Sequence, residues 1–286
     1  MDCPVCGRDL CFDHFDSWWD PDKFDWQRRS VDLAIYCSEH FHKWWDPDRF
    51  NWKGLWALVI FCSEYFDEWW DPNKLNWKKE SRDLAVHCSE HFHRWWNPDE
   101  FNWEDSWSLA RYCSDYFDIW WDPNKYNWED SRYLAKYCSK YFHKWWDHDR
   151  FNWKDASLEL AVYCSDYLPV WWDPNKYNWL DGSVGLATFC SKYFDKWWDP
   201  DRFNWQQASK LLAEFCGDYF DIWWDPNKYN WKQASGSLAE HCSEYFEKWW
   251  NPLKFNREHV RSLEKCYSEY KYVWEKELKL AGLLKA

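Results

Sequence analysis

The feature that most restricts how this chain can fold is a pair of adjacent tryptophans that returns every 25 or 26 residues. The pairs begin at positions 18, 44, 69, 95, 120, 145, 171, 197, 223 and 249. A further tryptophan follows at 26, 52, 77, 103, 128, 153, 179, 205 and 231. A fixed period of this length is typical of a solenoid, in which each unit packs on its neighbours, and not of a globule with one central core.

Apolar residues from Leu158 to Trp171 follow helical spacing, which one long helix or two shorter ones would satisfy equally well. Two departures favour two helices. The serine before the aromatic segment becomes Gly217 in one unit, and both residue types are good N-caps. Pro169 would cost about 3 kcal/mol in the middle of a long helix but much less in a first turn.

We therefore predict an all-α solenoid of about ten units without β-strands. Each unit holds a helix of about a dozen residues after an asparagine cap, and a shorter helix that ends at the tryptophan pair. The Asp-Pro that follows predicts a turn or a one-turn helix, with aspartate as its cap and proline at its first position.

Three segments follow from where the repeat starts and stops. Residues 1–14 form a cysteine-rich N-terminal cap, residues 15–256 form the repeat solenoid, and residues 257–286 form a C-terminal capping helix, since Arg257 stands where a tryptophan is expected. Inside the solenoid, Asp-Arg-Phe and Asn-Lys-Tyr units alternate, which gives a super-repeat of about 51 residues. Either an ancestral pair was duplicated or the two classes face different surroundings.

The 13 cysteines do not cluster. Those at 11, 37, 62, 88, 113, 138, 164, 190, 216 and 242 form a regular ladder that Cys266 continues. One cysteine per repeat beside an alanine indicates a small buried hydrophobe kept reduced inside the cell. A disulfide ladder between neighbouring repeats is the alternative.

The N-terminus holds a metal-binding pattern. Cys3-Pro4-Val5-Cys6-Gly7 is similar to the knuckle of zinc ribbons, in which a tight turn presents two thiolates to one ion. Cys11 and His14 lie three residues apart and share one helix face, so these four residues predict a closed structural zinc site. The alternative is that Cys11 and His14 are repeat positions only.

A ladder of positive charge occupies the second position after proline, or after His148 in one unit, and is broken only by Glu100. Its members are Lys23, Arg49, Lys74, Lys125, Arg150, Lys176, Arg202, Lys228 and Lys254. The ladder either pairs with the aspartates two or three residues earlier or follows a phosphate backbone. The net charge of -13 opposes nucleic-acid binding and leaves room for the reverse, an acidic mimic of DNA.

Packing between repeats accounts for most of the tryptophans, although adjacent helical residues lie about 100° apart, so the second of each pair need not be fully buried. The remaining histidines are expected at the surface. Catalytic constellations are singular, whereas the conspicuous residues here recur in nearly every unit, so we expect no enzyme and no small-molecule substrate. No run approaches a membrane span, and no signal peptide starts the chain, which predicts an intracellular, cytoplasmic protein.

Asp-Pro-Asn-Lys-Tyr-Asn-Trp, at residues 122–128 and 173–179, resembles the short Trp-rich helical repeats of giant amoeba-infecting DNA viruses, including the marseillevirus group. The resemblance covers about residues 12–256 and implies a viral protein of the virion or of the early host interaction, without site residues. Together these patterns predict a structural or protein-interaction scaffold. The alternative is a nucleic-acid-associated protein that uses the Lys/Arg ladder.

Overall fold

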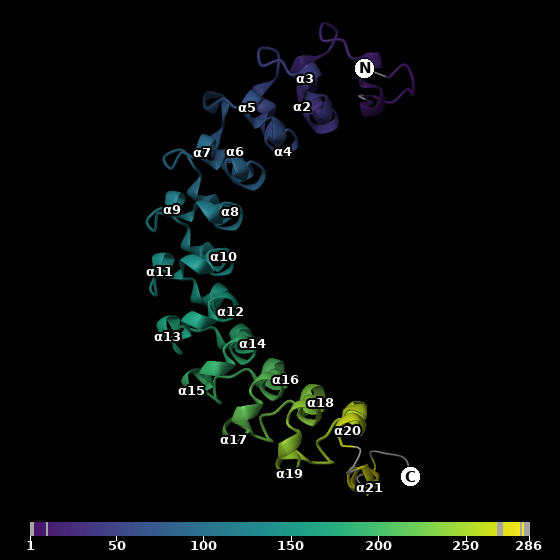
Figure 1. Ribbon diagram of the computed structural model, residues 1–286, viewed down its shortest axis with the longest axis vertical. Coiled ribbons are helices and arrows are strands. Elements are labelled where there is room, and N and C mark those ends of the chain that lie inside the picture. Colours follow the sequence, from purple (N-terminus) through teal and green to yellow (C-terminus); the bar gives the residue numbers. More distant parts are fainter. Residues whose placement is uncertain (1–2, 10, 268–270, 281, 283–286) are drawn as a thin grey trace. The chain divides into compact units, whose positions relative to one another are not determined.

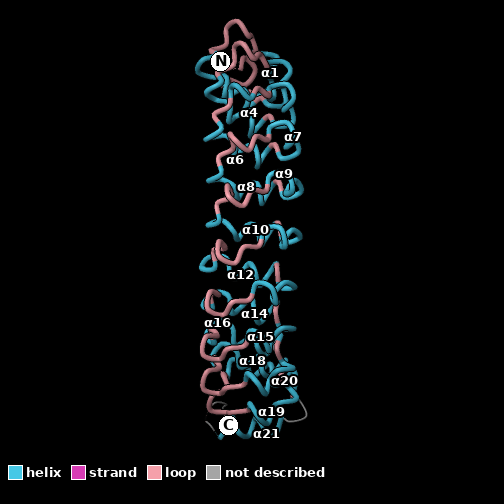
Figure 2. The backbone as a smooth tube through the Cα atoms, turned by 90° about the vertical axis from the view of Figure 1, so that its left-hand side faces the viewer, coloured by secondary structure: helices cyan, strands magenta, loops and turns pink. Residues whose placement is uncertain are grey.

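The computed structural model describes residues 3–9, 11–267, 271–280 and 282, in two compact units that comprise residues 1–133 and 134–286. The described residues form helices, turns and loops without a β-strand (Figure 2). Within each unit, the same two-helix repeat is stacked, with the long helices along one side and the short helices along the other (Figure 1). The predicted all-α helical solenoid is therefore confirmed.

The long helix exists in two forms, which explains why the period is 25 or 26 residues. In the longer form it is an eleven-residue α-helix: α2 (Trp26–Tyr36), α6 (Trp77–His87), α12 (Trp153–Tyr163), α14 (Trp179–Phe189), α16 (Trp205–Phe215) and α18 (Trp231–His241). In the shorter form a 3-10 turn precedes seven α-helical residues: η3 (Trp52–Gly54) and α4 (Leu55–Phe61), η7 (Trp103–Asp105) and α8 (Ser106–Tyr112), η9 (Trp128–Asp130) and α10 (Ser131–Tyr137). A 3-10 turn rises further per residue than an α-helix, so the shorter form covers a similar length with one residue fewer.

The short helix is a 3-10 turn followed by a single α-helical turn that ends at the first tryptophan. In unit 1 these are η1 (Phe12–His14) with α1 (Phe15–Trp18), η2 (Ser38–His40) with α3 (Phe41–Trp44), η4 (Ser63–Tyr65) with α5 (Phe66–Trp69), η6 (Ser89–His91) with α7 (Phe92–Trp95), and η8 (Ser114–Tyr116) with α9 (Phe117–Trp120). In unit 2 they are η10 (Ser139–Tyr141) with α11 (Phe142–Trp145), η11 (Ser165–Tyr167) with α13 (Leu168–Trp171), η12 (Ser191–Tyr193) with α15 (Phe194–Trp197), η13 (Gly217–Tyr219) with α17 (Phe220–Trp223), and η14 (Ser243–Tyr245) with α19 (Phe246–Trp249).

The junction between the two helices differs in detail from the prediction. The expected serine N-cap is wrong, because Ser165 is the first residue of η11 and the cap position belongs to Cys164, whose side chain makes no capping bond. The predicted tolerance of Pro169 is confirmed, since Pro169 lies in the first turn of α13. The Asp-Pro turn is also as predicted. Asp71 accepts a hydrogen bond from the Asn73 N–H at the start of η5 (Pro72–Lys74).

The two tryptophans of a pair have different roles. The Trp171 side chain is fully buried, and its indole N–H donates to the carbonyl of Cys164, 2.8 Å away, which holds the short helix against the long one. The same bond recurs from Trp18 to Trp249 in the other pairs. The second tryptophan is half-buried, as Trp45 is where it stacks on Phe41 at 5.2 Å.

Neighbouring repeats are joined by backbone-directed hydrogen bonds and by ring stacking. The buried Ser183 hydroxyl accepts from the Asn204 N–H at 3.0 Å, and the Asn204 amide donates to the Leu180 carbonyl at 2.7 Å. In the aromatic layer, Tyr219 lies nearly parallel to Phe194 of the repeat before it, with centroids 4.6 Å apart. These contacts use the asparagine, serine and aromatic positions that recur in the sequence.

The C-terminal stretch predicted as a capping helix contains η15 (Arg257–His259), α20 (Val260–Cys266) and α21 (Lys271–Leu280). It keeps one element of the repeat, because the buried Trp274 donates to the Tyr267 carbonyl at 3.2 Å, as the first tryptophan of a pair does. The prediction that Cys266 continues the cysteine ladder is wrong. Tyr267 occupies the ladder position, and Cys266 is exposed.

Candidate metal centre and cation ladder

Cys3, Cys6, Cys11 and His14 come together at the N-terminal end of unit 1. Their ligand atoms all lie within 4.8 Å of one another. Cys11 Sγ is 3.4 Å from Cys6 Sγ and 3.4 Å from His14 Nδ1. Ligands about 2.3 Å from a tetrahedral ion stand about 3.8 Å apart. The four side chains that the sequence predicts as ligands are thus arranged so that they could hold a metal ion.

A tight turn brings Cys3 and Cys6 onto the same side. The Gly7 N–H donates to the Cys3 carbonyl at 2.8 Å, and the Cys3 N–H donates to the Arg8 carbonyl at 2.8 Å. Gly7 has a φ of 71°, in the left-handed region that favours glycine. The Val5 N–H points at Cys3 Sγ from 3.4 Å. Backbone N–H groups aimed at a sulfur favour its thiolate form, which is the form that binds metal.

The three thiols differ in how readily they ionise. The backbone N–H of Arg8 lowers the pKa of Cys6 to about 7. For Cys3, burial raises the pKa, but hydrogen bonds from the Cys6 backbone and other groups together lower it by a larger amount, so the pKa falls below its usual range. Burial raises the pKa of Cys11. A metal ion would favour the thiolate of all three.

The alternative explanation of Cys11 and His14 as repeat positions is also partly right. The Cys11 carbonyl accepts from Trp18, as the ladder cysteines do from their own tryptophans. However, ladder thiols such as Cys190 point at the carbonyl of the preceding repeat, 3.6 Å from Ala161 O. The described residues 3–9 form a turn and not a repeat, and the Cys11 thiol is directed to Cys6 and His14 instead.

The other ladder cysteines, Cys37 to Cys242, are buried and form no disulfides. Burial raises the pKa of the Cys164 thiol to about 12, and the same holds along the ladder. This agrees with the prediction of small buried hydrophobes. The expected surface position holds for His42, His93 and His143, whereas His40 and His91 are half-buried and stack on phenylalanines at 4.6 and 4.5 Å.

The cation ladder lies in the loops after the tryptophan pairs and binds the preceding repeat. Lys125, Lys176 and Lys228 donate to aspartates of that repeat, at 3.1, 2.8 and 2.7 Å. Each also donates to a backbone carbonyl there, at 3.0, 3.2 and 3.1 Å. Arg49, Arg202 and Lys254 likewise donate to a proline carbonyl one repeat back. The ladder therefore works as a series of clamps between repeats.

Pairing with an aspartate of the same loop, as the sequence suggested, also occurs, and Arg49 and Arg202 lie 3.4 Å from Asp46 and Asp199 in addition to their contacts with the preceding repeat. Lys23 is 2.6 Å from Asp20, and Arg150 is 3.6 Å from Asp147. Lys74 differs, because its ammonium lies over the Trp52 ring at 5.6 Å. The structure thus accounts for these cations by contacts within the protein, which disfavours a free stripe for phosphates.

The clamp has two kinds of acceptor, since the acceptor position holds aspartate in some units and asparagine in others. In unit 2, Lys228 donates to the carboxylate of Asp201, and Arg202 donates from both terminal nitrogens to the amide oxygen of Asn175. Lys254 also donates to an asparagine, Asn227, so the choice of lysine or arginine does not strictly follow the acceptor. The clamp is compatible with both explanations of the alternation.

An exposed aromatic position at the end of the long helices escaped the sequence reasoning. In unit 1, Tyr36 and Phe61 are exposed, and in unit 2, Tyr163, Phe189 and Phe215 are exposed. The signal was available, because the residue before each ladder cysteine from Cys37 to Cys242 is an aromatic residue or histidine. Helical spacing alone did not predict whether this position is buried or exposed, since it lies between the buried face of the helix and its polar face.

Among the described residues, no helix combines the length and the apolar character needed to cross a membrane. Comparison with known proteins gives no match to a family model, to a curated protein or to a solved structure.

Proposed function

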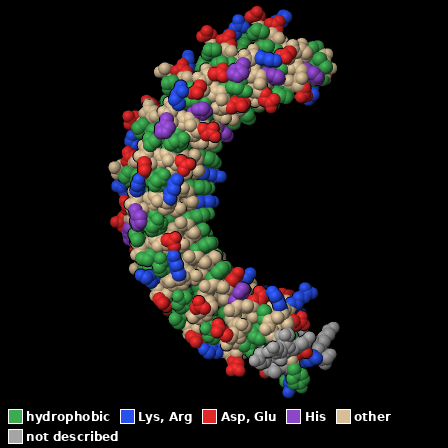
Figure 3. Space-filling view, in the orientation of Figure 1, with side chains coloured by type: hydrophobic (Ala, Val, Ile, Leu, Met, Phe, Trp, Pro, Cys, Tyr) green, Lys and Arg blue, Asp and Glu red, His purple; other side chains and the backbone are tan. Residues whose placement is uncertain are grey.

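We propose that this protein is a non-enzymatic scaffold that binds protein partners through the exposed side of its long helices. The observation that carries the proposal is the repeated exposed ring at the last residue of those helices. Phe189 and Phe215 are 47% and 42% exposed, and Tyr36 is 59% exposed. Hydrophobic side chains reach the surface along the edge formed by the long helices (Figure 3). Aromatic residues gathered on a surface are typical of protein-binding sites.

The remaining repeated groups favour a scaffold over an enzyme. The serine, asparagine, cysteine and cation positions bind the neighbouring repeat, as Ser183 and Lys228 do. Such groups stabilise the stack and are not arranged around a single reacting centre. We include in the proposal that the scaffold acts in a virion or in the cytoplasm of an infected cell, which rests on the resemblance to the repeats of amoeba-infecting viruses.

We also propose that the N-terminal cluster binds zinc as a structural ion. Three thiols and one imidazole are a usual ligand set for zinc, and a fourth ligand closes the coordination sphere. The ion would fasten the turn of residues 3–8, which precedes the first repeat, to α1.

The scaffold is tested by photo-cross-linking in cells that express the whole chain. Benzoylphenylalanine at Phe189 or Phe215 should cross-link one defined partner, and the same residue at Ile222 serves as the control. Ile222 is 57% exposed on α17, among the short helices. Cross-links that are identical from Phe189 and Ile222, or absent from both, would overturn the proposal. A partner captured at Phe189 should be lost from the Phe189→Ser, Phe215→Ser variant.

A further inference from the structure

A shallow hollow of about 550 Å³ lies at the loop edge of unit 2, beside the first turn of α18. It is bounded by the loop that precedes this helix and by the loop that follows α19. Two of the lining side chains are cations and none is a carboxylate, in a protein whose net charge is -13. The lining consists of Pro226, Asn227, Trp231, Lys232, Lys254 and Asn256.

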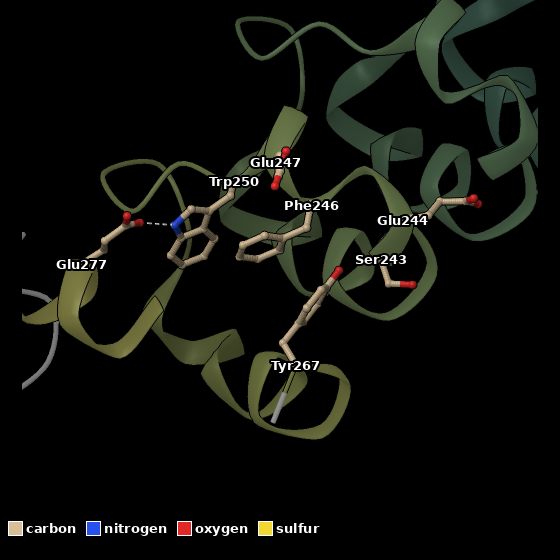
Figure 4. A pocket seen from close by; sticks show the side chains of 7 residues that line it. All are labelled: Ser243, Glu244, Phe246, Glu247, Trp250, Tyr267 and Glu277. Carbon is tan, nitrogen blue, oxygen red and sulfur yellow. Dashed lines mark hydrogen bonds between the residues drawn. The ribbon is translucent and has the colours of Figure 1, made fainter. Parts of the chain in front are cut away.

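The lack of carboxylates separates this hollow from two others in the described part of unit 2. A hollow of about 600 Å³ three repeats earlier holds Lys154 and Lys176 at the same repeat positions, but Asp155 and Asp181 also line it. The hollow drawn in Figure 4, beside α19, is lined by three glutamates. Of these three hollows, the one beside α18 alone has cations without carboxylates.

Two asparagines account for the difference, because they stand where other ladder cations meet a carboxylate. Lys228 lies 2.7 Å from Asp201 of the preceding repeat. For Lys254 the same position holds Asn227, and the acidic position of its own loop holds Asn251. The other ladder cations of unit 2 each lie within 3.6 Å of an aspartate.

The Lys254 ammonium is held at the hollow by neutral acceptors. It donates to the Pro226 carbonyl at 2.8 Å and to Asn227 Oδ1 at 3.2 Å. Among the described residues, no carboxylate lies within 4.0 Å of this ammonium. An ammonium group carries three N–H donors, so one stays available. The charge of Lys254 is therefore fixed in place but not neutralised.

Lys232 adds a second positive charge to the same hollow. It is exposed as the second residue of α18, and its ammonium forms no hydrogen bond or ion pair with a described residue. The Asn256 amide donates to the Lys232 carbonyl at 2.6 Å, which joins the loop of Lys254 to this turn of the helix. Two like charges that line one hollow repel each other, and an anion bound there would attract both.

The hydrogen-bonding groups that remain available at the hollow are donors. Asn227 Oδ1 and the Pro226 carbonyl accept from Lys254. Asn256 Oδ1 accepts from the backbone N–H two residues later. The N–H groups of the Asn227 amide and of the Lys232 ammonium donate to no described residue. Available N–H donors beside two cations suit an anion, whereas a cation would be repelled.

Two charges and several donors suit a phosphomonoester better than a carboxylate. A phosphomonoester carries a charge of about -1.5 to -2 at neutral pH and offers three acceptor oxygens. A carboxylate carries one negative charge on two oxygens. Lysine is a common ligand of phosphate groups, to which it contributes a point charge.

We propose that this hollow binds a phosphomonoester group, held by Lys232, Lys254 and the Asn227 amide. A phosphorylated protein side chain and a small phosphate compound share this chemistry. The site lies apart from the exposed rings of the long helices and goes beyond the scaffold function proposed above. It is a single site and not a track for a nucleic-acid backbone, because the other ladder cations of unit 2 pair with aspartates. Binding involves no covalent step.

The test is calorimetry on the full-length protein at low salt. The probe is a short glycine peptide with phosphoserine at its centre, and matched peptides carry serine or glutamate there. The phosphoserine peptide should bind at least about tenfold tighter than the serine peptide, and its affinity should fall as the salt concentration rises. Equal affinities for these two peptides would overturn the site. Equal affinities for the phosphoserine and glutamate peptides would overturn the assignment to a phosphomonoester.

Protein variants locate the binding. Asn227→Asp should pair with Lys254 and weaken the phosphoserine peptide about tenfold. The repeat should stay folded, because Asp201 occupies the same position one repeat earlier. Lys232→Gln should weaken the peptide about fivefold. Lys154→Gln, at the same repeat position in the hollow three repeats earlier, is the matched control and should leave binding unchanged. Binding that survives both Asn227→Asp and Lys232→Gln would show that the site is wrong.

Competition with inorganic phosphate identifies the source of the group. Inorganic phosphate that binds as tightly as the peptide supports a small phosphate compound, and tighter binding of the peptide supports a phosphorylated protein. The cross-link from Phe189 should persist in the Asn227→Asp variant. If the cross-link is present and the peptide does not bind, only the hollow is wrong. If the cross-link is absent while the peptide binds, the scaffold face on the long helices is wrong instead.

Discussion

The N-terminal and C-terminal ends of the repeat region differ from its interior in different ways. At the N-terminal end, the thiol of Cys11, whose counterparts in later repeats face a carbonyl of the preceding repeat, is directed to Cys6 and His14 in a cluster that could hold a metal ion. At the C-terminal end, Tyr267 takes the place of the ladder cysteine, and the buried Trp274 of α21 donates to its carbonyl.

The comparison shows that the chemical role of a repeat position depends on the segment that packs against it. A cysteine between two repeats is a buried hydrophobe whose thiol stays protonated, and the same position at the open end is a candidate ligand. At the other end, the ladder position holds a tyrosine and keeps the backbone hydrogen bond from a buried tryptophan. The predictions below test whether the ends differ from the interior in this way.

Removal of the metal should have the largest effect. Chelation, or Cys3→Ser with Cys6→Ser, should release the turn of residues 3–8 and loosen α1, because structural zinc can supply about 10 kcal/mol or more to a small site at neutral pH. Hydrogen exchange should quicken over residues 11–24 and stay unchanged in unit 2. Metal analysis should find one zinc per chain. Cys266→Ser is the matched control, and a metal-free protein with the same exchange rates would exclude a structural ion.

The same comparison can be made by alkylation of the thiols across a range of pH. In metal-free protein, Cys6 has a pKa of about 7 and is exposed, so its thiolate fraction and its reaction rate should rise through pH 7. Ladder thiols such as Cys164, with a pKa of about 12, remain protonated and buried at every pH below about 11. Added zinc should protect Cys6 and leave the exposed Cys266 reactive. A ladder cysteine that reacts as fast as Cys6 in folded protein would contradict this account.

Loss of an interior tryptophan should cost more of the structure than loss of the terminal one. Trp171→Ala removes a fully buried ring and the bond to Cys164, at about 3–5 kcal/mol. Trp171 lies between repeats, so hydrogen exchange should quicken in both α12 and α14. Trp274→Ala removes an equally buried ring whose bond joins α21 to Tyr267, the residue after α20, so the loosening should stay within α20 and α21. Equal spread of the damage from both sites would show that unit 2 unfolds as one body.

A smaller effect is expected from the hydrogen bond that joins repeats. Ser183→Ala leaves the Asn204 N–H without its acceptor and should cost about 1–2 kcal/mol, measured by urea unfolding and local exchange. Ser191→Ala in the same repeat is the control, because Ser191 begins η12 and its side chain forms no hydrogen bond with a described residue. The chain contains a natural exception at Leu55, which stands in the serine position and is buried. If both serine variants are equally stable, the Ser–Asn clamp is not a source of cohesion.

The sequence predicted the repeat, the two-helix unit and the four residues of the N-terminal cluster, because each depends on spacing along the chain. It could not predict partners that come from the next repeat. The spacing of Lys228 from Asp225 suggested a pair within one loop, whereas the structure pairs Lys228 with Asp201 of the preceding repeat. The sequence did not reveal that Tyr267 occupies the ladder position, because a cysteine, Cys266, lies only one residue before it.

The cation ladder should give the smallest effect. Lys125→Glu, Lys176→Glu and Lys228→Glu each place two carboxylates together, but these lysines are half-exposed, so each change should cost less than about 1 kcal/mol. Neither the triple variant nor the wild type should bind double- or single-stranded DNA at low salt, because the cations already bind the preceding repeat and the net charge is -13. Lys210→Glu on α16 is the control for charge. Tight binding to DNA with a steep salt dependence, lost in the triple variant and kept in the control, would make the ladder a nucleic-acid interface and would contradict its assignment as a clamp between repeats.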